Sequence, residues 1–335
     1  MAVGVLLVGG FGTRLMPLTK HTPKPMLTVA GLPVTEHQLA MARKAGITTV
    51  VLATSYLSEL FTPYFGDGTR WGMKLLYAVE KEPLGTGGAI VHAAQLLNTD
   101  ESIVVFNGDV LSSHDLAEQI RQHEANSADV TLHLTIVEDA RAYGCVPTDS
   151  DGRVTAFLEK MEKPIAHTIN AGCYVFNPSV VKSMPRDRVL SVERETFPGL
   201  INNHGKVWGF IDRSYWLDIG TPRALLQGSR DLVTGLADAS ALHMADVALH
   251  NEHSLIMRSA SVDASAIIDK GSCIGAGASI GAGAHISGSI IDSGAVVSKG
   301  AVIIDSFVAS AAHVSENSHI SASFVTKDEI LSIPA

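Results

Sequence analysis

The stretch "VGVLLVGGFGTRLMPLTKHTPKPM", from Val3 to Met26, joins an apolar run, a glycine-rich turn and a loop punctuated by prolines. An apolar run of this length, followed at once by glycines, predicts a buried β-strand that ends in a turn. Gly9, Gly10 and Gly12 let the backbone approach a ligand and present N–H groups to negative oxygens. The stretch therefore predicts an anion site at the end of the first strand.

The spacing of these glycines excludes two familiar phosphate loops. A dinucleotide-binding fingerprint needs a third glycine where this chain has Leu15, and a P-loop needs a Gly-Lys-Ser/Thr end that this stretch lacks. The loop does carry Arg14 and Lys24, which suit a bidentate and a point-charge contact to an anion. A phosphate site of a third kind is one interpretation, and a strand end with surface cations is the other.

Apolar runs of strand length alternate with segments of helical period up to about residue 236. The strand candidates are Val3–Val8, Thr49–Ala53, Lys74–Val79, Ile103–Phe106, Val130–Val137, Ala171–Phe176 and Lys206–Ile211. The helix candidates are Thr35–Ala45, Thr86–Leu97 and Leu116–Ala125. This alternation predicts an α/β domain with a doubly wound, mainly parallel sheet. Ligands of such sheets lie beyond the carboxyl ends of the strands, so the glycine turn and the "NGD" turn at 107–109 should meet at one edge.

After about residue 240, aliphatic residues recur every six positions with one exception. The repeated positions are Val262, Ile268, Ile274, Ile280 and Ile286, then after a step of four Ile290, Val296, Val302, Val308, Val314 and Ile320. This period is typical of a short left-handed β-helix, whereas a disordered segment would not keep its aliphatic residues in register. We expect a large domain at 1–237, a linker at 238–258 and a β-helix at 259–326.

Bulk composition narrows the possible partners and compartments. The formal net charge of −9 provides no overall positive field, which argues against nucleic-acid binding. Cys145, Cys173 and Cys273 are far apart without metal-ligand spacing, and they fit a reduced protein. The Val3–Val8 run is too short for a signal peptide, and no other run is long enough to cross a membrane. We therefore expect a cytoplasmic protein that has no membrane partner.

The opening stretch resembles the GxGTRLxPLTxxxPKPM signature of the sugar-nucleotide pyrophosphorylases, nucleotidyltransferases that join a sugar 1-phosphate to a nucleoside triphosphate. The resemblance continues, in the family's order, through "EPLGTGGAI" (82–90), "VVFNGD" (104–109), "FLEK" (157–160), "NAGCYVF" (170–176), "SVERETFP" (191–198) and "YWLDIGTP" (215–222). The pairing of "SVERETFP" with "EPLGTGG" and terminal hexapeptide repeats is most similar to the branch that makes GDP-mannose from GTP and mannose 1-phosphate. A Rossmann-like nucleotidyltransferase fold is implied.

Catalysis in this family needs cations more than it needs a base. The sugar phosphate attacks the α-phosphorus and expels pyrophosphate, and a phosphate monoester with a second pKa of about 6 is already mostly dianionic at neutral pH. The remaining task is to align two polyanions and neutralise the charge that builds up. The resemblance assigns Arg14 to the β- and γ-phosphates, Lys24 to the α-phosphate and Lys160 to the sugar phosphate. It also places Gly9, Gly10, Gly12 and Thr13 in the nucleotide-binding loop.

Repulsion between the two substrates calls for a divalent ion as well. Mg²⁺ is held by few carboxylates together with phosphate oxygens, and the family pattern assigns Asp109 and Asp218 to it. Asp109 is thereby a catalytic residue too. A lone aspartate beside glycine is more often a turn or cap residue, which is the alternative for each.

The base can be chosen by one side chain. Guanine presents two adjacent donors that one carboxylate can accept, whereas uracil and thymine present a single donor between two carbonyls, which suits a glutamine amide. The base-reading position of the family aligns best with Glu80 and second best with Glu82, which favours GTP; a solvated charged turn is the alternative. The other nucleotide-binding positions of this segment are Pro83, Gly85, Thr86, Gly87 and Gly88, where larger side chains at the glycines would collide with base or ribose.

The sugar site is expected around 144–170. Glu159 and Asn170 can hydrogen bond with sugar hydroxyls, and Gly144 would let the backbone approach the ring. A second Glu-Lys pair at 162–163 leaves the register open, although the F-x-E-K spacing of the family favours Glu159 with Lys160. Nothing in these residues separates mannose from glucose by physics, so that preference comes from the resemblance.

Several alternative functions remain at this stage. Glucose-1-phosphate uridylyl- or thymidylyltransferase activity is one, and a non-catalytic regulatory subunit that binds sugar nucleotides is another. Hexapeptide repeats also build acyltransferases, but fewer than four coils without a long insertion make His285, His313 and His319 better read as surface residues. The open ends and flat faces of a short β-helix predict a homo-oligomer assembled through residues 255–325.

Overall fold

The computed structural model describes residues 2–55, 57–186 and 188–333. The chain divides into two units, the first made of Met1–Phe11 and Gln38–Trp216, the second of Gly12–His37 and Leu217–Ala335. This division differs from the expected boundary near residue 237, because the segment that follows the first glycines packs with the C-terminal part of the chain.

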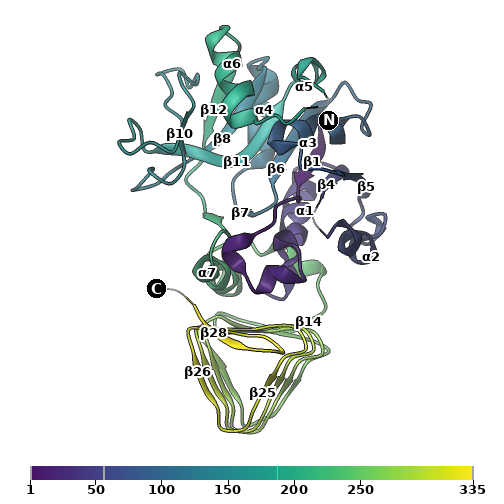
Figure 1. Ribbon diagram of the computed structural model, residues 1–335, viewed down its shortest axis with the longest axis vertical. Coiled ribbons are helices and arrows are strands. Elements are labelled where there is room, and N and C mark those ends of the chain that lie inside the picture. The colour runs from purple at the N-terminus through teal and green to yellow at the C-terminus, as the bar shows by residue number, and fades with distance from the viewer. Residues whose placement is uncertain (1, 56, 187, 334–335) are drawn as a thin grey trace. The chain divides into compact units, whose positions relative to one another are not determined.

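A nine-stranded sheet forms the centre of the first unit (Figure 1). Its order is β10-β9-β11-β6-β1-β4-β5, with β8 beside β11 and β12 beside β8. The strands are β1 (Ala2–Leu7), β4 (Thr49–Thr54), β5 (Lys74–Val79), β6 (Ser102–Asn107), β8 (Val130–Ile136), β9 (Gly144–Cys145), β10 (Leu158–Glu159), β11 (Thr168–Phe176) and β12 (Val207–Ile211). Strands β6, β1, β4 and β5 are parallel, whereas β11 runs antiparallel to β6 and β8. The predicted α/β class is confirmed, with a mixed sheet.

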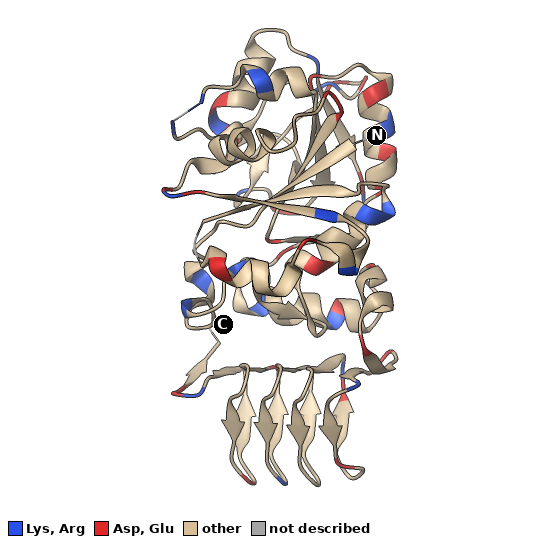
Figure 2. Ribbon diagram, turned by 90° about the vertical axis from the view of Figure 1, so that its right-hand side faces the viewer, with Lys and Arg blue, Asp and Glu red and all other residues tan. Residues whose placement is uncertain are grey.

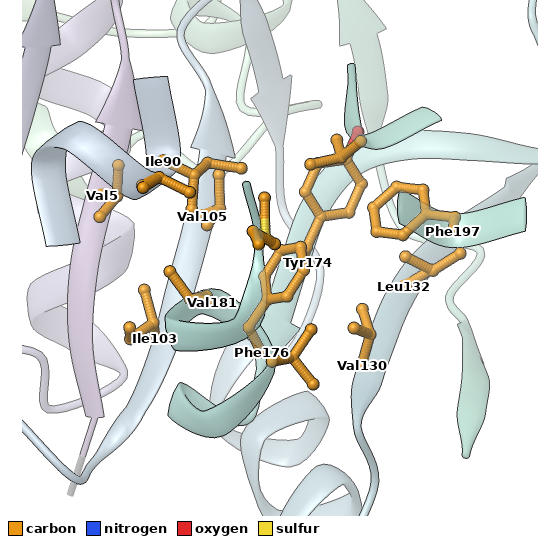
Figure 3. Packing of buried hydrophobic residues seen from close by; sticks show 14 of the residues in the cluster. Val5, Ile90, Ile103, Val105, Val130, Leu132, Tyr174, Phe176, Val181 and Phe197 are labelled. Carbon is orange, nitrogen blue, oxygen red and sulfur yellow. The ribbon is translucent and has the colours of Figure 1, made fainter. Parts of the chain in front are cut away.

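Helices flank this sheet and supply part of its core. They are α1 (Val34–Lys44), α2 (Phe61–Phe65), α3 (Gly85–Ala94), α4 (Leu116–Ala125), α5 (Pro178–Ser183) and α6 (Phe197–Asn202), the last preceded by a π-helical turn at Val192–Thr196. Figure 3 shows Val5 and Val105 of neighbouring strands next to Ile90 of α3, and Phe197 of α6 near Tyr174. Burial of these apolar side chains, which water would otherwise hydrate, is the main force that holds α3 and α6 on the sheet.

The second unit contains a β-helix built from three sheets of short strands. One sheet has the order β14-β15-β18-β21-β24-β27-β28, and the others are β16-β19-β22-β25 and β17-β20-β23-β26. The strands are β14 (Val247–His250), β15 (Ser254–Met257), β16 (Ser261–Val262), β17 (Ile267–Asp269), β18 (Ser272–Ile274), β19 (Ser279–Ile280), β20 (His285–Ser287), β21 (Ile290–Ile291), β22 (Val296–Val297), β23 (Val302–Ile304), β24 (Phe307–Val308), β25 (His313–Val314), β26 (His319–Ser321), β27 (Ser323–Val325) and β28 (Ile330–Ser332). Successive coils pair in parallel, consistent with the predicted left-handed β-helix (Figure 1).

The ends of the seven-stranded sheet are covered by antiparallel strands. β14 pairs antiparallel with β15 at one end, and β28 pairs antiparallel with β27 at the other. The segment 238–258, expected to be a linker, therefore contains two strands of the β-helix sheet. Figure 2 shows that the strands of the β-helix carry few charged residues.

The N-terminal hairpin of the second unit packs on the seven-stranded sheet together with α7 (Pro222–Val233). The hairpin consists of β2 (Thr28–Val29) and β3 (Leu32–Pro33). The Thr28 hydroxyl donates to Asp292 Oδ1 at 3.0 Å, and Arg230 of α7 donates to Asp305 Oδ1 at 2.6 Å. Burial raises the pKa of Asp292 above its usual value. The basic loop that precedes the hairpin is thus anchored on the β-helix.

The inward-facing positions of the β-helix differ from the expected ones in part of the repeat. The interior contains, in chain order, Ile274, Ile280, Ile286, Ile291, Val297, Ile303, Val308, Val314 and Ile320. The expected positions Ile290, Val296 and Val302 are wrong by one residue. Val296 is 39% exposed and its neighbour Val297 is 1% exposed, because successive strand residues point to opposite faces.

A shorter corner explains this shift. In the first coil the corner holds two residues with positive φ, Lys270 at 50° and Gly271 at 73°. Later coils use a single such residue, for example Gly288 at 55° and Asp305 at 48°. Strand pairing reflects the loss of one residue, since Leu255 pairs with Cys273 eighteen positions on, and Cys273 pairs with Ile290 seventeen positions on.

Buried serines line this corner and form what we call the serine ladder: Ser272, Ser289, Ser306 and Ser323. Each hydroxyl donates to a carbonyl of its own corner, as Ser306 does to Ile304 at 2.7 Å. Each hydroxyl of the first three also accepts the N–H of the serine in the next coil, at 3.0 to 3.1 Å. The ladder therefore gives an acceptor to the buried serine N–H groups and a second donor to carbonyls that already accept an N–H of the next coil.

Replacing Ser306 with alanine is expected to destabilise the β-helix by about 1–3 kcal/mol, because the buried N–H of Ser323 loses its acceptor and the Ile304 carbonyl loses one of its two donors. The measurement is the free energy of unfolding from denaturant titration. Ser310→Ala is the matched control, since that hydroxyl donates to Ser293 from an exposed position. Equal stability of the two variants would show that the ladder contributes nothing.

Candidate active site

The carboxyl ends of β1 and β6 lie side by side in the first unit. Leu7 pairs with Asn107, and the N–H of Gly108 donates to the Leu7 carbonyl at 2.9 Å. A side chain at Gly108 would come within 2.3 Å of that carbonyl oxygen, so the turn requires glycine. The glycine turn and the "NGD" turn therefore meet at one sheet edge, as the topology predicted.

Gly9 and Gly10 are glycines for different reasons. A Cβ at Gly9 would lie 2.7 Å from Ser55 Oγ, which donates to the Gly9 carbonyl at 2.6 Å. Gly10 is exposed, and among the described residues nothing lies within 4 Å of where its Cβ would be. Protein packing accounts for Gly9, whereas Gly10 leaves an open space that a ligand can fill.

Asp109 follows β6 in a turn that another side chain fixes. Gln38 of α1 donates through Nε2 to the carbonyls of Asn107 and Val110, at 2.6 and 2.9 Å. These bonds bracket Asp109, which is half-buried. Sequence analysis did not single out Gln38, since a lone glutamine in a helix carries no signal of its partner.

The basic loop belongs to the second unit and folds back on itself. Thr13 and Arg14 lie in the 3₁₀ turn Thr13–Leu15, and Lys24 begins another at Lys24–Met26. Gly12 has a φ of 62°, and a Cβ there would lie 2.9 Å from Lys24 Cβ. Gly12 is therefore needed for the two turns to pack against each other.

Three charged side chains gather in the second unit as the Arg14–Lys24–Asp218 cluster. Lys24 is only 7% exposed, and its Nζ lies 3.9 Å from Oδ1 of Asp218, the last residue of β13 (Trp216–Asp218). A Cβ at Gly220 would lie 2.8 Å from Arg14 Nη2 and 3.0 Å from both Asp218 carboxylate oxygens. The fold thus brings Asp218 next to residues some 200 positions earlier in the chain, and Gly220 provides the space that these side chains occupy.

The oxygen donors present suit Mg²⁺. In the described parts of the chain, no three His, Cys, Asp or Glu side chains gather as they would in an all-protein metal site. Mg²⁺ does not need such a site, because it keeps water and substrate phosphate oxygens among its ligands. Asp109 follows β6 and Asp218 ends β13, each with a glycine within two positions, and their carboxylate oxygens are the ligands that Mg²⁺ prefers.

Glu80 is better placed to read a base than Glu82. It follows β5 directly, and its Oε2 accepts the N–H of Leu84 at 3.2 Å. Its Oε1 is buried and has no hydrogen-bond partner within the described residues. Burial raises the pKa of Glu80 above its usual value, whereas Glu82 is exposed on the turn. The Leu84 N–H fixes the Glu80 carboxylate, whose two oxygens together keep acceptor positions for two adjacent donors.

The "PLGTGG" loop opens α3 and packs on the segment before the π-helical turn. Pro83 and Gly85 are exposed, while Gly87 and Gly88 are buried. A Cβ at Gly87 would lie 2.6 Å from Leu190 Cγ, and one at Gly88 would lie 2.6 Å from Leu84 Cβ. A Cβ at Gly85, where φ is 72°, would lie 2.6 Å from the Leu190 carbonyl oxygen, so packing against protein accounts for all three glycines of this loop.

Three of the residues expected to bind the sugar, Gly144, Glu159 and Asn170, lie on neighbouring strands of the sheet. Glu159 of β10 pairs with Gly144 of β9, and a Cβ at Gly144 would lie 3.0 Å from Glu159 Oε2. Lys160 follows with a φ of 47° and an N–H bond to Tyr143, and it is exposed. Asn170 lies on β11, which adjoins β9. The second Glu-Lys pair at 162–163 lies in an exposed loop outside these strands, which favours the first register.

Glu193 in the π-helical turn was not identified as a site residue by sequence analysis. Its Oε2 accepts hydrogen bonds from Thr86 and Ser191, both at 2.7 Å. The signal that could have found it is the "SVERETFP" stretch, which served there only as a family marker. The start of α3 is therefore held by a carboxylate more than 100 positions away.

Cys145, Cys173 and Cys273 are buried and unpaired. Burial raises the pKa of the thiols of Cys173 and Cys273, so these cysteines are packing residues rather than nucleophiles. In the described part of the chain, no helix has the length and apolar character needed to cross a membrane.

Glycine turns at the carboxyl edge of an α/β sheet, with a basic loop next in sequence, define a class of enzymes that handle nucleotides. The chain belongs to the nucleotidyl transferase family, whose model matches residues 3–235. The family expected from the sequence motifs is thus confirmed.

Several relatives carry the same name. A Mycobacterium tuberculosis protein named mannose-1-phosphate guanylyltransferase is 51% identical over 250 residues, which cover 74% of this chain and 69% of that protein. The mannose-1-phosphate guanylyltransferase catalytic subunit beta of Danio rerio is 36% identical, over 67% of this chain and 62% of its own length. The chain thus spans about two thirds of the length of these relatives.

Solved structures agree with the fold. HddC from Yersinia pseudotuberculosis, crystallised with GMP-PN, has a TM-score of 0.60 and 28% identity over 68% of this chain and 98% of its own. A Bacillus anthracis chain crystallised with sucrose has a TM-score of 0.62 over 68% of this chain and 94% of its own, and at 22% identity it supports the fold alone.

Proposed function

We propose that the protein transfers the guanylyl group of GTP to mannose 1-phosphate, giving GDP-mannose and pyrophosphate. The observation that carries the choice of GTP is Glu80, whose carboxylate is fixed at one oxygen and is buried without a hydrogen-bond partner at the other. Guanine offers N1–H and its 2-amino group side by side, which such a carboxylate can accept. The names of the Mycobacterium tuberculosis and Danio rerio relatives support both substrates.

The mechanism relies on positioning and charge. The dianionic phosphate of the sugar attacks the α-phosphorus and pyrophosphate leaves, so no residue has to remove a proton from the nucleophile. Arg14 holds the β- and γ-phosphates, and Lys24 neutralises the charge that develops at the α-phosphate. The burial of Lys24 strengthens that interaction, because few waters screen its charge. Lys160, exposed beside β10, binds the phosphate of the sugar.

Asp109 and Asp218 are the proposed ligands of Mg²⁺. When bound, this ion reduces the repulsion between the two substrates and stabilises charge on the phosphates. Glu159, Asn170 and the backbone at Gly144 orient the hydroxyls of the sugar, and the exposed Gly10 leaves space for the nucleotide.

Replacing Glu80 with glutamine is expected to lower kcat/KM for GTP about 10- to 100-fold, since the amide places a donor against a guanine donor. The loss should appear mainly in KM for GTP, and UTP and dTTP should be unaffected or improved. Glu82→Gln is the matched control on the exposed turn and should leave all three nucleotides unchanged. An equal loss for UTP would contradict the reading of the base by Glu80.

The same carboxylate predicts a pH dependence. Guanine binding requires the ionised form of Glu80, and burial raises its pKa above the ordinary glutamate value of about 4.3. As pH falls through this raised pKa, the carboxyl gains a proton, and KM for GTP should rise. KM for GTP measured from pH 7 to pH 4 should therefore rise in the native protein and stay flat in Glu80→Gln.

The proposed function is tested by crossing substrates. Pyrophosphate release is measured for mannose 1-phosphate and glucose 1-phosphate, each with GTP, UTP and dTTP. The proposal requires GTP with mannose 1-phosphate to have the highest kcat/KM. Highest activity for glucose 1-phosphate with UTP or dTTP would establish the alternative transferase, and no release with any pair would favour a regulatory subunit.

We also propose that the protein is a cytoplasmic homo-oligomer joined through residues 255–325. The β-helix presents flat sheets with few charges, and Ile267 is 56% exposed on one of them (Figure 2). The unpaired cysteines fit a reducing compartment. Sedimentation that gives a single species of monomer mass would contradict the oligomer.

A further inference from the structure

The Tyr174 hydroxyl lies wholly inside the first unit, on β11, with every hydrogen-bonding position occupied. It accepts Nδ2 of Asn170 at 2.8 Å and a second bond from the side chain of Asn107, and it faces Glu193 Oε1 at 3.5 Å. A phenol hydroxyl has two acceptor positions and one donor, so these three partners saturate it. Figure 3 shows the ring of Tyr174 packed near Phe197, which excludes water.

Each partner belongs to a different part of the proposed active site. Asn107 begins the "NGD" turn that carries Asp109, and Asn170 is a proposed sugar ligand. Glu193 holds the Thr86 hydroxyl at 2.7 Å, at the start of α3 in the nucleotide loop. One buried hydroxyl thus joins the metal turn, the sugar strand and the nucleotide loop.

A backbone N–H group holds the side chain at each end of this hydrogen-bond network. The N–H of Gly172 donates to Asn170 Oδ1 at 3.1 Å, and the N–H of Val192 donates to Thr86 Oγ1 at 3.1 Å. Burial keeps Tyr174 protonated, since it raises the pKa of its hydroxyl well above the usual value. A shift of Asn170 on sugar binding can therefore be transmitted through Tyr174 and Glu193 to Thr86. A shift of Thr86 on nucleotide binding can be transmitted to Asn170 by the same contacts.

We infer that Tyr174 and Glu193 are positioning residues that couple the sugar strand to the nucleotide loop, so that binding of one substrate sets the affinity for the other. Neither residue has to touch a substrate in this role. The inference rests on the proposed function of the residues at the two ends of the network.

The test is a mutant cycle on kcat/KM between Thr86→Val and Asn170→Ala, made in the native protein and in Tyr174→Phe. In the native protein, the double variant should lose less than the product of the single losses, by about tenfold, because either change breaks the same network. In Tyr174→Phe, the two losses should multiply. Asn170→Ala should also raise KM for GTP in the native protein and leave it unchanged in Tyr174→Phe.

Tyr77→Phe is the matched control. Its hydroxyl donates to the Gly66 carbonyl, away from the three joined segments, so it should leave the coupling intact. If Tyr174→Phe does not fold, Glu193→Gln removes one of the two accepting oxygens and serves in its place. Losses that multiply in the native protein would overturn the inference.

Failure of the proposed function has a different signature. A native protein that releases no pyrophosphate from GTP and mannose 1-phosphate contradicts that function, and the cycle is then repeated with the pair that the substrate cross identifies. An active native protein in which Thr86 and Asn170 act independently contradicts the inference alone.

Discussion

Replacing Lys24 with methionine is expected to lower kcat for GDP-mannose formation about 10²- to 10³-fold, the usual cost of removing one charge-stabilising donor from an active site. Methionine keeps the length of the side chain and tolerates burial, so the fold should persist. Loss of the ammonium leaves the Asp218 carboxylate without a cation 3.9 Å away and leaves the charge at the α-phosphate unbalanced. Steady-state release of pyrophosphate measures the effect.

Whether Lys24→Met changes kcat or KM distinguishes a role in catalysis from a role in substrate binding. Because the charge that Lys24 neutralises develops in the transition state, kcat should fall while KM for GTP changes little. Lys20→Met is the matched control, since Lys20 is an exposed lysine of the same loop. A rise in KM at unchanged kcat would show that Lys24 binds the ground state only.

Replacing Asp109 with asparagine is expected to lower kcat about 10³-fold at a fixed Mg²⁺ concentration, because the amide retains the size but loses the charge that holds a divalent ion. The Mg²⁺ concentration for half-maximal rate should rise with it. Pyrophosphate release is followed across a Mg²⁺ titration.

The chain offers a matched aspartate for this experiment. Asp115 caps α4 by accepting the N–H of Glu118 at 2.9 Å, and asparagine caps helices as well as aspartate does. Asp115→Asn should therefore leave rate, Mg²⁺ dependence and stability unchanged. Unchanged pyrophosphate release in Asp109→Asn would contradict both the assignment of Asp109 to the metal and its catalytic role.

The sequence was informative where a local pattern has one physical meaning. An apolar run of strand length located β5 (Lys74–Val79), and a segment of helical period located α4 (Leu116–Ala125), both at their observed bounds. The edge shared by the two glycine turns followed from the topology of parallel strands alone. The six-residue period identified the β-helix, since each step of six residues places one aliphatic side chain of a short strand in the interior of the β-helix.

Prediction failed where the outcome depended on a corner or on a distant partner. Val296 and Val297 are adjacent and chemically identical, so the sequence cannot tell which faces inward; the one-residue corner at Gly288 decides it. Likewise, the hydrogen bond between Thr86 and Glu193 joins residues more than 100 positions apart, and no local sequence pattern predicts it. The site residues themselves were proposed from motifs, and their roles stay predictions until the variants are measured.

The serine ladder restricts how this protein can change its length. Each hydroxyl receives the N–H of the serine seventeen residues later, so coils repeat as identical units that can be duplicated or deleted whole. A duplication of seventeen residues would extend the ladder by one step. A duplication of eighteen residues would need a corner with two residues of positive φ, as at Lys270 and Gly271 in the first coil, to keep the aliphatic side chains of the next coil inside. The β-helix can thus grow or shrink in evolution only in whole coils.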